Sequence, residues 1–131
     1  MVSRLSGAFA AGTLGGLVNS LAVWIFGEAG ISAAMGVDIH PHLSPPWLYQ
    51  RLVWGGIWGF LFLLPILKKS VMARGLLFSL GPSIVMLLLV FPNMGKGAYG
   101  LSLGTLNPLL VLIFNAVWGL VAALWYSASA E

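Results

Sequence analysis

Four long runs of apolar residues divide the chain, and most of its charged residues fall between them. The runs cover residues 5–27, 47–67, 75–94 and 106–126. As an α-helix that rises 1.5 Å per residue, each run is long enough to cross a hydrocarbon core of about 30 Å. The pattern therefore predicts an all-α integral membrane protein. We expect one domain, residues 1–131, that forms a four-helix bundle of two helical hairpins.

The ends of the second run are marked on both sides. Trp47 and Tyr49 stand near its start, where aromatic rings prefer the headgroup level, and Lys68 and Lys69 follow its end. The first run is longer than the roughly 7–15 apolar residues of a signal peptide, so we expect an uncleaved span.

Prolines predict local features of the third and fourth helices. Pro82 should bend the third helix, because its ring clashes with a carbonyl one turn back. Asn107 and Pro108 suit the start of the fourth helix, with asparagine as the cap and proline in the first turn.

Small residues recur at intervals of four in every run. This spacing places them on one face of a helix, and small residues let helices approach closely in lipid. We expect these rows to pack within the bundle, although one row on the first helix could instead face a partner subunit. The main candidates for packing are Gly12, Gly16, Gly55, Gly59 and Gly119, with Ala8 and Ser20 in line with the first pair.

The two halves of the chain share a short motif. Val53-Trp54-Gly55 recurs 64 residues later as Val117-Trp118-Gly119. If the halves are duplicated, each forms one hairpin, and an axis along the membrane normal relates the two as a parallel repeat. A chance recurrence of three apolar residues is the alternative.

Composition supports the membrane assignment. Hydrophobic residues make up 60% of the chain and charged residues only 7%, with a mean hydropathy of +0.99, whereas soluble domains average about 25% charged residues. The net charge of +3 comes without a basic patch, so we expect a lipid bilayer and no nucleic acid as partner. The absence of cysteine removes disulfides and thiolate metal sites.

The basic residues predict the orientation in the membrane. Four spans place both termini on one side, and the side richer in lysine and arginine is usually cytoplasmic. We therefore expect both termini in the cytoplasm and the 28–46 loop outside, with a dual-topology dimer as the alternative. The terminal side carries Arg4, Lys68, Lys69 and Arg74, and the other side carries Arg51 and Lys96.

Ionisable residues are almost absent from the spans. No aspartate, glutamate, histidine or lysine lies within the four runs, which argues against a proton-coupled antiporter and a haem site. Arg51 is the exception. It either snorkels to the headgroups and pairs with Glu28 or Asp38, or it is a fixed charge for an anion, a lipid headgroup or a quinone carbonyl. Asn19 and Asn115 either bond across helices or line a polar path.

The first loop contains a weak metal candidate. Asp38, His40 and His42 have the residue types that bind zinc or copper, but their spacing is not that of a standard site. We therefore expect polar loop residues, no metal and no cofactor. The serines have no triad partners in a recognisable motif, so we expect no enzymatic activity.

Three segments resemble the YagU-like small inner-membrane proteins. They are RGLLFSLG at 74–81, VFPNMGKGAYGL at 90–101 and NAVWGLV at 115–121. The resemblance extends over most of the chain and implies a polytopic protein of a bacterial inner membrane without an established activity. That family often has a histidine where Asn115 stands, so the resemblance implies no cofactor and no functional residue here.

These observations favour an accessory or structural subunit that packs against other membrane proteins or itself. The alternative is a small oligomeric channel or carrier for an anion or neutral solute, based on Arg51, Asn19 and Asn115. A metal- or quinone-binding protein is the third hypothesis.

Overall fold

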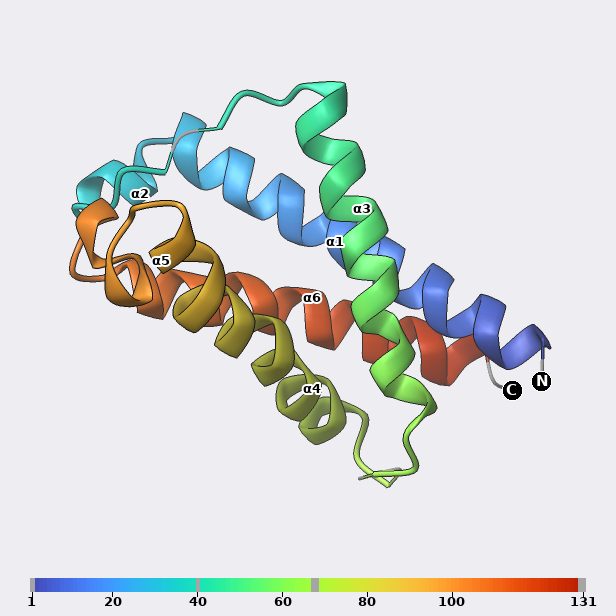
Figure 1. Ribbon diagram of the computed structural model, residues 1–131. Helices are drawn as coiled ribbons and strands as arrows, with labels where there is room; N and C mark the ends of the chain where they lie inside the picture. The colour runs from blue at the N-terminus through green and yellow to red at the C-terminus, as the bar shows by residue number, and fades with distance from the viewer. Residues whose placement is uncertain (1, 40, 67–68, 130–131) are drawn as a thin grey trace.

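The computed structural model describes residues 2–39, 41–66 and 69–129, and within these ranges it is all-helical and has no strand. The N- and C-terminal ends lie close together at one end of the molecule, and α2 and α5 lie at the other (Figure 1). In chain order the elements are α1 (Val2–Glu28), α2 (Ile31–Ala34), α3 (Pro45–Gly59), η1 (Phe60–Leu63), α4 (Val71–Val85), η2 (Met86–Val90), α5 (Phe91–Asn93), η3 (Ala98–Leu103) and α6 (Asn107–Ser129).

Three helices are long and apolar enough to cross a membrane, and they indicate a membrane-embedded protein. They are Ser3–Glu28, Val71–Asn93 and Asn107–Ala128. The remaining predicted span contains α3, whose 15 residues reach only about 22 Å. The 3₁₀-helix η1 adds about 8 Å, so the two together approach the thickness of a hydrocarbon core. The fourth crossing therefore remains a prediction.

The second span does not continue as an α-helix to residue 67. The α-helix ends at Gly59, η1 follows, and Leu64 is extended with ψ of 131°. Pro65 explains the end, because a proline disfavours the helical conformation of the residue before it. Residue 67 lies outside the described residues. The Nη2 group of Arg74 donates to the carbonyls of Phe62 and Leu64, and the Leu64 carbonyl also accepts the Ile66 N–H at 2.9 Å.

The third span begins earlier than predicted, and its irregularity follows Pro82. Ser70 caps α4 by accepting the Ala73 N–H at 3.2 Å, so the helix starts at Val71 rather than at Gly75. The helix continues past Pro82 into η2, a π-helical turn over Met86–Val90. Such turns occur within α-helices where the regular hydrogen-bond ladder is perturbed.

The fourth helix starts where the sequence predicts, but without the predicted cap. Asn107 is the first residue of α6 and Pro108 lies in its first turn. The Asn107 Nδ2 donates to the Tyr99 carbonyl at 3.1 Å, while its Oδ1 has no hydrogen-bond partner among the described residues. The capping prediction was wrong, because Asn107 is already the first helical residue and its Oδ1 accepts no N–H from the described residues.

Glycines close the first hairpin, in which α3 packs across α1. Gly12 and Gly16 of α1 face Gly55 and Gly59 of α3, and all four residues are buried. A Cβ atom on Gly12 would lie 2.7 Å from the Gly59 Cα, and one on Gly16 would lie 2.9 Å from the Arg51 carbonyl oxygen. The two backbones are therefore too close for any side chain at these positions.

The second hairpin has a corresponding crossing between α4 and α6. A Cβ atom on Gly75 would lie 2.6 Å from the Gly119 carbonyl oxygen and 3.1 Å from the Ala123 Cβ, and one on Gly119 would lie 3.0 Å from the Ser79 Cβ. These residues follow their counterparts in the first crossing by 63 or 64 positions, as a duplicated hairpin would require. The corresponding pairs are Gly12 and Gly75, Gly16 and Ser79, Gly55 and Gly119, and Gly59 and Ala123.

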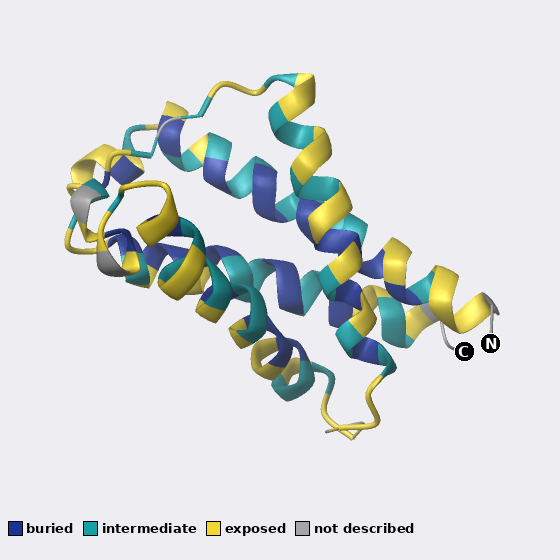
Figure 2. Cartoon of the chain, in the orientation of Figure 1, coloured by how far each residue is buried: buried dark blue, intermediate teal, exposed yellow. Residues whose placement is uncertain are grey.

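The two hairpins meet mainly through α1 and α6. The buried indole of Trp118 donates its Nε1–H to the Gly12 carbonyl at 3.1 Å, and its main chain packs on Gly15. The buried residues gather along these two helices, whereas much of α3 is exposed (Figure 2). Trp54, the counterpart of Trp118 in the first hairpin, is 61% exposed. The contact between α1 and α6 is therefore closed, whereas the related contact between α3 and α4 is largely open.

Candidate binding cavity

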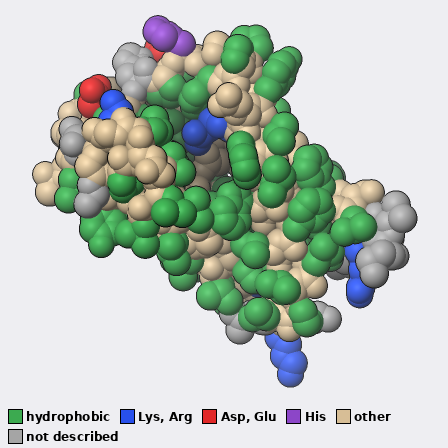
Figure 3. Space-filling model, in the orientation of Figure 1, with side chains coloured by type: hydrophobic (Ala, Val, Ile, Leu, Met, Phe, Trp, Pro, Cys, Tyr) green, Lys and Arg blue, Asp and Glu red, His purple; other side chains and the backbone are tan. Residues whose placement is uncertain are grey.

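A cavity of about 610 Å³ lies between α3 and the α4–α5 segment, with α1 and α6 behind it. Figure 3 shows this hollow with a basic side chain inside it, on a face that is otherwise covered largely by hydrophobic side chains. Mostly apolar walls with a few converging polar groups are typical of sites for small ligands. The polar residues that line the cavity are Asn19, Gln50, Arg51 and Asn115.

Arg51 lies in the wall of the cavity, and its side chain points into the protein. Its Nε donates to Ser20 Oγ at 2.9 Å and its Nη2 donates to Asn19 Oδ1. Its guanidinium carbon also lies 4.8 Å from the centre of the Trp47 ring, which adds a cation–π contact. Asn19 precedes the end of α1 by nine residues, or about 13 Å along the helix axis. The guanidinium thus reaches well inside the bundle instead of extending to the end of the helix.

Among the described residues, no carboxylate lies beside the positive charge of Arg51. Arginine stays protonated in proteins and has five N–H donors, of which the two hydrogen bonds use two. In the part of the chain that the structure describes, no ion pair joins Arg51 to an acidic residue, and no acceptor contacts its other three donors. A partly buried charge without a counter-charge is costly, so an anion entering the cavity would be stabilised there.

The second hairpin makes a similar helix-to-helix hydrogen bond without a charge. Asn115 follows Arg51 by 64 residues, and its Nδ2 donates to Ser83 Oγ at 3.1 Å. Ser83 corresponds to Ser20, and each serine donates to the carbonyl four residues earlier, at 2.8 and 2.7 Å. A neutral amide is thus sufficient to join the two helices of a hairpin. The charge of Arg51 exceeds what packing requires.

Asn19 links three helices beside the cavity. Its Nδ2 donates to the Phe114 carbonyl of α6 at 2.6 Å, while its Oδ1 accepts from Arg51 of α3. Asn115 is the residue after Phe114 and also lines the cavity. The structure therefore brings Asn19, Arg51 and Asn115 together in one cavity. Ser20 was not predicted as an acceptor for Arg51, although the 64-residue offset between Arg51 and Asn115 could have suggested a shared role.

The acidic candidates are not brought to Arg51. Glu28 is exposed at the end of α1, and Asp38 is exposed in the following loop, where its backbone N–H donates to the Leu103 carbonyl at 2.8 Å. His42 is exposed, and His40 lies outside the described residues. Among the described residues, no group of three histidine, aspartate or glutamate side chains is placed to hold a metal ion.

Comparison with known proteins adds no relative, since no family model, curated protein or solved structure matches the chain. The resemblance to the YagU-like proteins therefore stays a prediction, and the geometry of the cavity is the basis for a functional assignment.

Proposed function

We propose that this protein binds the anionic group of a solute at Arg51, as the binding step of a small membrane carrier, and that it has no enzymatic activity. One observation carries the proposal. A guanidinium held by Asn19 and Ser20 lies in the wall of an apolar cavity, and no carboxylate from the described part of the chain lies beside it. The neutral Asn115 at the corresponding position supports the assignment of the charge to ligand binding rather than to packing.

An anion fits this cavity better than a neutral solute does. Asn19 already donates to Phe114 and accepts from Arg51, and the Asn115 amide already donates to Ser83. The guanidinium still has three N–H groups that its two hydrogen bonds do not use, and it alone adds a charge, which makes its hydrogen bonds about twice as strong as neutral ones.

Replacing Arg51 by asparagine should weaken anion binding while the protein stays folded, because the variant copies the residue of the second hairpin. Hydrogen bonds to a charged group contribute about 1.5–3 kcal/mol, so affinity should fall by about tenfold or more. Binding can be followed by tryptophan fluorescence, since Trp47 lies against Arg51 and Trp54 and Trp58 line the cavity. The ligands to test are carboxylates and phosphates, both small and long-chain.

Arg51→Lys is the matched variant, because it keeps the charge but loses the planar fork, and its affinity should be intermediate. Thermal unfolding of all three proteins in the same detergent provides the folding control. If no anion in the set bound the wild type more tightly than Arg51→Asn, the carrier proposal would be wrong.

We also propose that the protein resides in a bacterial inner membrane with both termini in the cytoplasm. The excess of basic residues on the terminal side supports this orientation, and the two ends of the chain lie close together (Figure 1). A reporter that is active only in the cytoplasm should be active when fused after residue 131. Activity of a periplasmic reporter alone would reverse the assignment, and equal activity of both would indicate dual topology.

A role as an accessory subunit is the second candidate. It is favoured by the exposed apolar side of α3, where Val53, Trp54 and Ile57 are 52%, 61% and 41% exposed. Crosslinking in native membranes should then capture another membrane protein or a second copy. A strictly monomeric protein that captures no partner would contradict this role.

A further inference from the structure

We propose that the solute is a single-chain amphiphile with an anionic headgroup, and that it reaches Arg51 from the bilayer through the opening between α3 and α4. This inference rests on the proposed function, because it takes Arg51 as the anion site. It adds the chemical class of the ligand and its route. Three observations support it: the direction of the opening, the chemistry of the walls and the size of the cavity.

The opening lies on the side of the bundle. Near one end of the cavity α3 and η1 meet α4, where the side chains of Trp58 and Leu61 lie over Gly81. Elsewhere α3 packs on α1 and α4 packs on α6, so the two helices that flank the cavity belong to different hairpins. The hollow opens on a largely hydrophobic face (Figure 3), and a face of this kind contacts acyl chains in a membrane. A solute that enters there comes from the hydrocarbon region.

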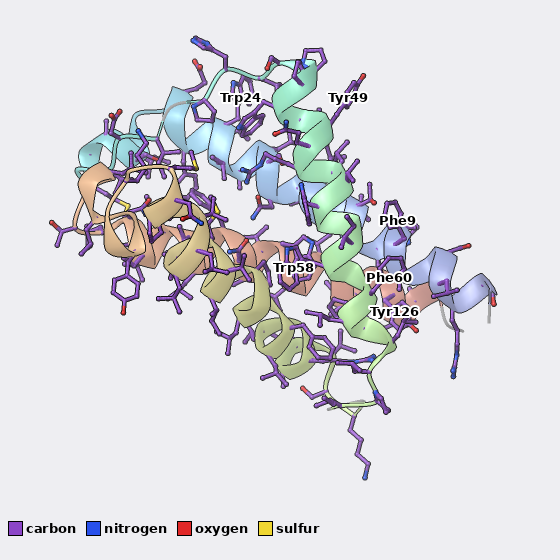
Figure 4. All side chains as sticks on the ribbon, viewed as in Figure 1. Phe9, Trp24, Tyr49, Trp58, Phe60 and Tyr126 are labelled. Carbon is purple, nitrogen blue, oxygen red and sulfur yellow. The ribbon has the colours of Figure 1, made fainter. Side chains whose placement is uncertain are left out.

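The walls offer separate places for a charged head and an apolar tail. Among the described residues that line the cavity, Arg51 supplies the only charged side chain, and Asn19 accepts a hydrogen bond from it. Trp58, Pro82, Val85 and Met86 line the cavity between α3 and the α4–η2 segment. Figure 4 shows Trp58 pointing from α3 toward this space, whereas Tyr49 points away from the bundle. An anionic head at Arg51 would leave its tail along these apolar walls.

The volume of the cavity suits a ligand with one alkyl chain. A cavity of 610 Å³ holds about twenty atoms of the size of a water molecule, at roughly 30 Å³ each. That is enough for one alkyl chain and a small headgroup. The headgroup chemistry is that of a carboxylate or phosphate, both of which arginine binds in bidentate fashion. A fatty acid and a lysophosphatidate are the two sources to distinguish.

The test uses the full-length protein in phosphatidylcholine nanodiscs and measures quenching of its tryptophans by dibromostearate. Wild type should show saturable quenching, and Arg51→Asn should raise the half-saturation concentration by about tenfold. Palmitate or lysophosphatidate should displace the probe, and the tighter competitor identifies the headgroup. The neutral palmitamide should not displace it. Val85→Phe, which narrows the cavity without touching Arg51 and adds no tryptophan, should also weaken quenching.

The results separate this inference from the function on which it rests. If acetate or inorganic phosphate displaced dibromostearate as well as palmitate does, the site would take its anion from water. The proposal that Arg51 binds an anion would then be supported, and an amphiphile would be excluded as the ligand. If Val85→Phe left quenching unchanged, the tail would not occupy the cavity, and the inference would also fall. If neither long-chain nor small anions depended on Arg51, both proposals would fail together.

Discussion

Replacing Gly12 by leucine is expected to destabilise the protein by about 3 kcal/mol or more, the upper end of what overpacking usually costs. The added Cβ alone would lie 2.7 Å from the Gly59 Cα, so the backbones of α1 and α3 would have to separate. Thermal unfolding in mild detergent should show the loss as a lower midpoint. Ala10→Leu is the matched control, because it adds the same side chain to an exposed position of α1.

The same comparison of buried and exposed positions can be made at other residues of α1. Gly16→Leu should behave like Gly12→Leu, since its Cβ would lie 2.9 Å from the Arg51 carbonyl oxygen. Leu17→Ala and Val18→Ala, on partly exposed flanks of α1, should have much smaller effects. If both leucine variants had the unfolding midpoint of the wild type while the alanine variants had a lower one, α1 and α3 would not pack against each other at these glycines.

Trp118→Ala should be the most damaging truncation in the second hairpin, at about 3–5 kcal/mol. Trp118 is 3% exposed and packs with Phe62 and Phe78 in the core between the hairpins. Trp54 occupies the corresponding position of the first hairpin but is 61% exposed. Trp54→Ala is therefore the matched control, and it should leave the unfolding midpoint nearly unchanged.

A further variant separates packing from hydrogen bonding at this position. Trp118→Phe keeps most of the buried ring but removes the Nε1–H that donates to the Gly12 carbonyl, so it should cost about 1 kcal/mol. Equal losses of stability for Trp54→Ala and Trp118→Ala would mean that α3 closes on α4 in the membrane as α6 closes on α1.

The sequence by itself determined where the long apolar helices lie and which small residues let them approach, but not the short helical segments α2 and η3 or the end of α3 at Gly59. Long apolar runs form helices in lipid because each backbone N–H and C=O group must be bonded within its own segment. Rows such as Gly12 and Gly16 could be read in advance because a period of four places residues on one helix face. The recurrence of Trp54-Gly55 as Trp118-Gly119 was likewise visible in the chain, and the corresponding glycines occupy corresponding crossings.

Only the tertiary structure decided how the polar groups pair and where the bundle is open. The sequence placed Arg51 near a helix end and suggested Glu28 or Asp38 as its partner, but the crossing of α3 over α1 aims its side chain at Asn19 and Ser20. Helix periodicity cannot predict such a choice, because it depends on how two helices are rotated and shifted relative to each other. For the same reason, equivalent tryptophans face different surroundings, and the cavity lies where α3 and α4 fail to close.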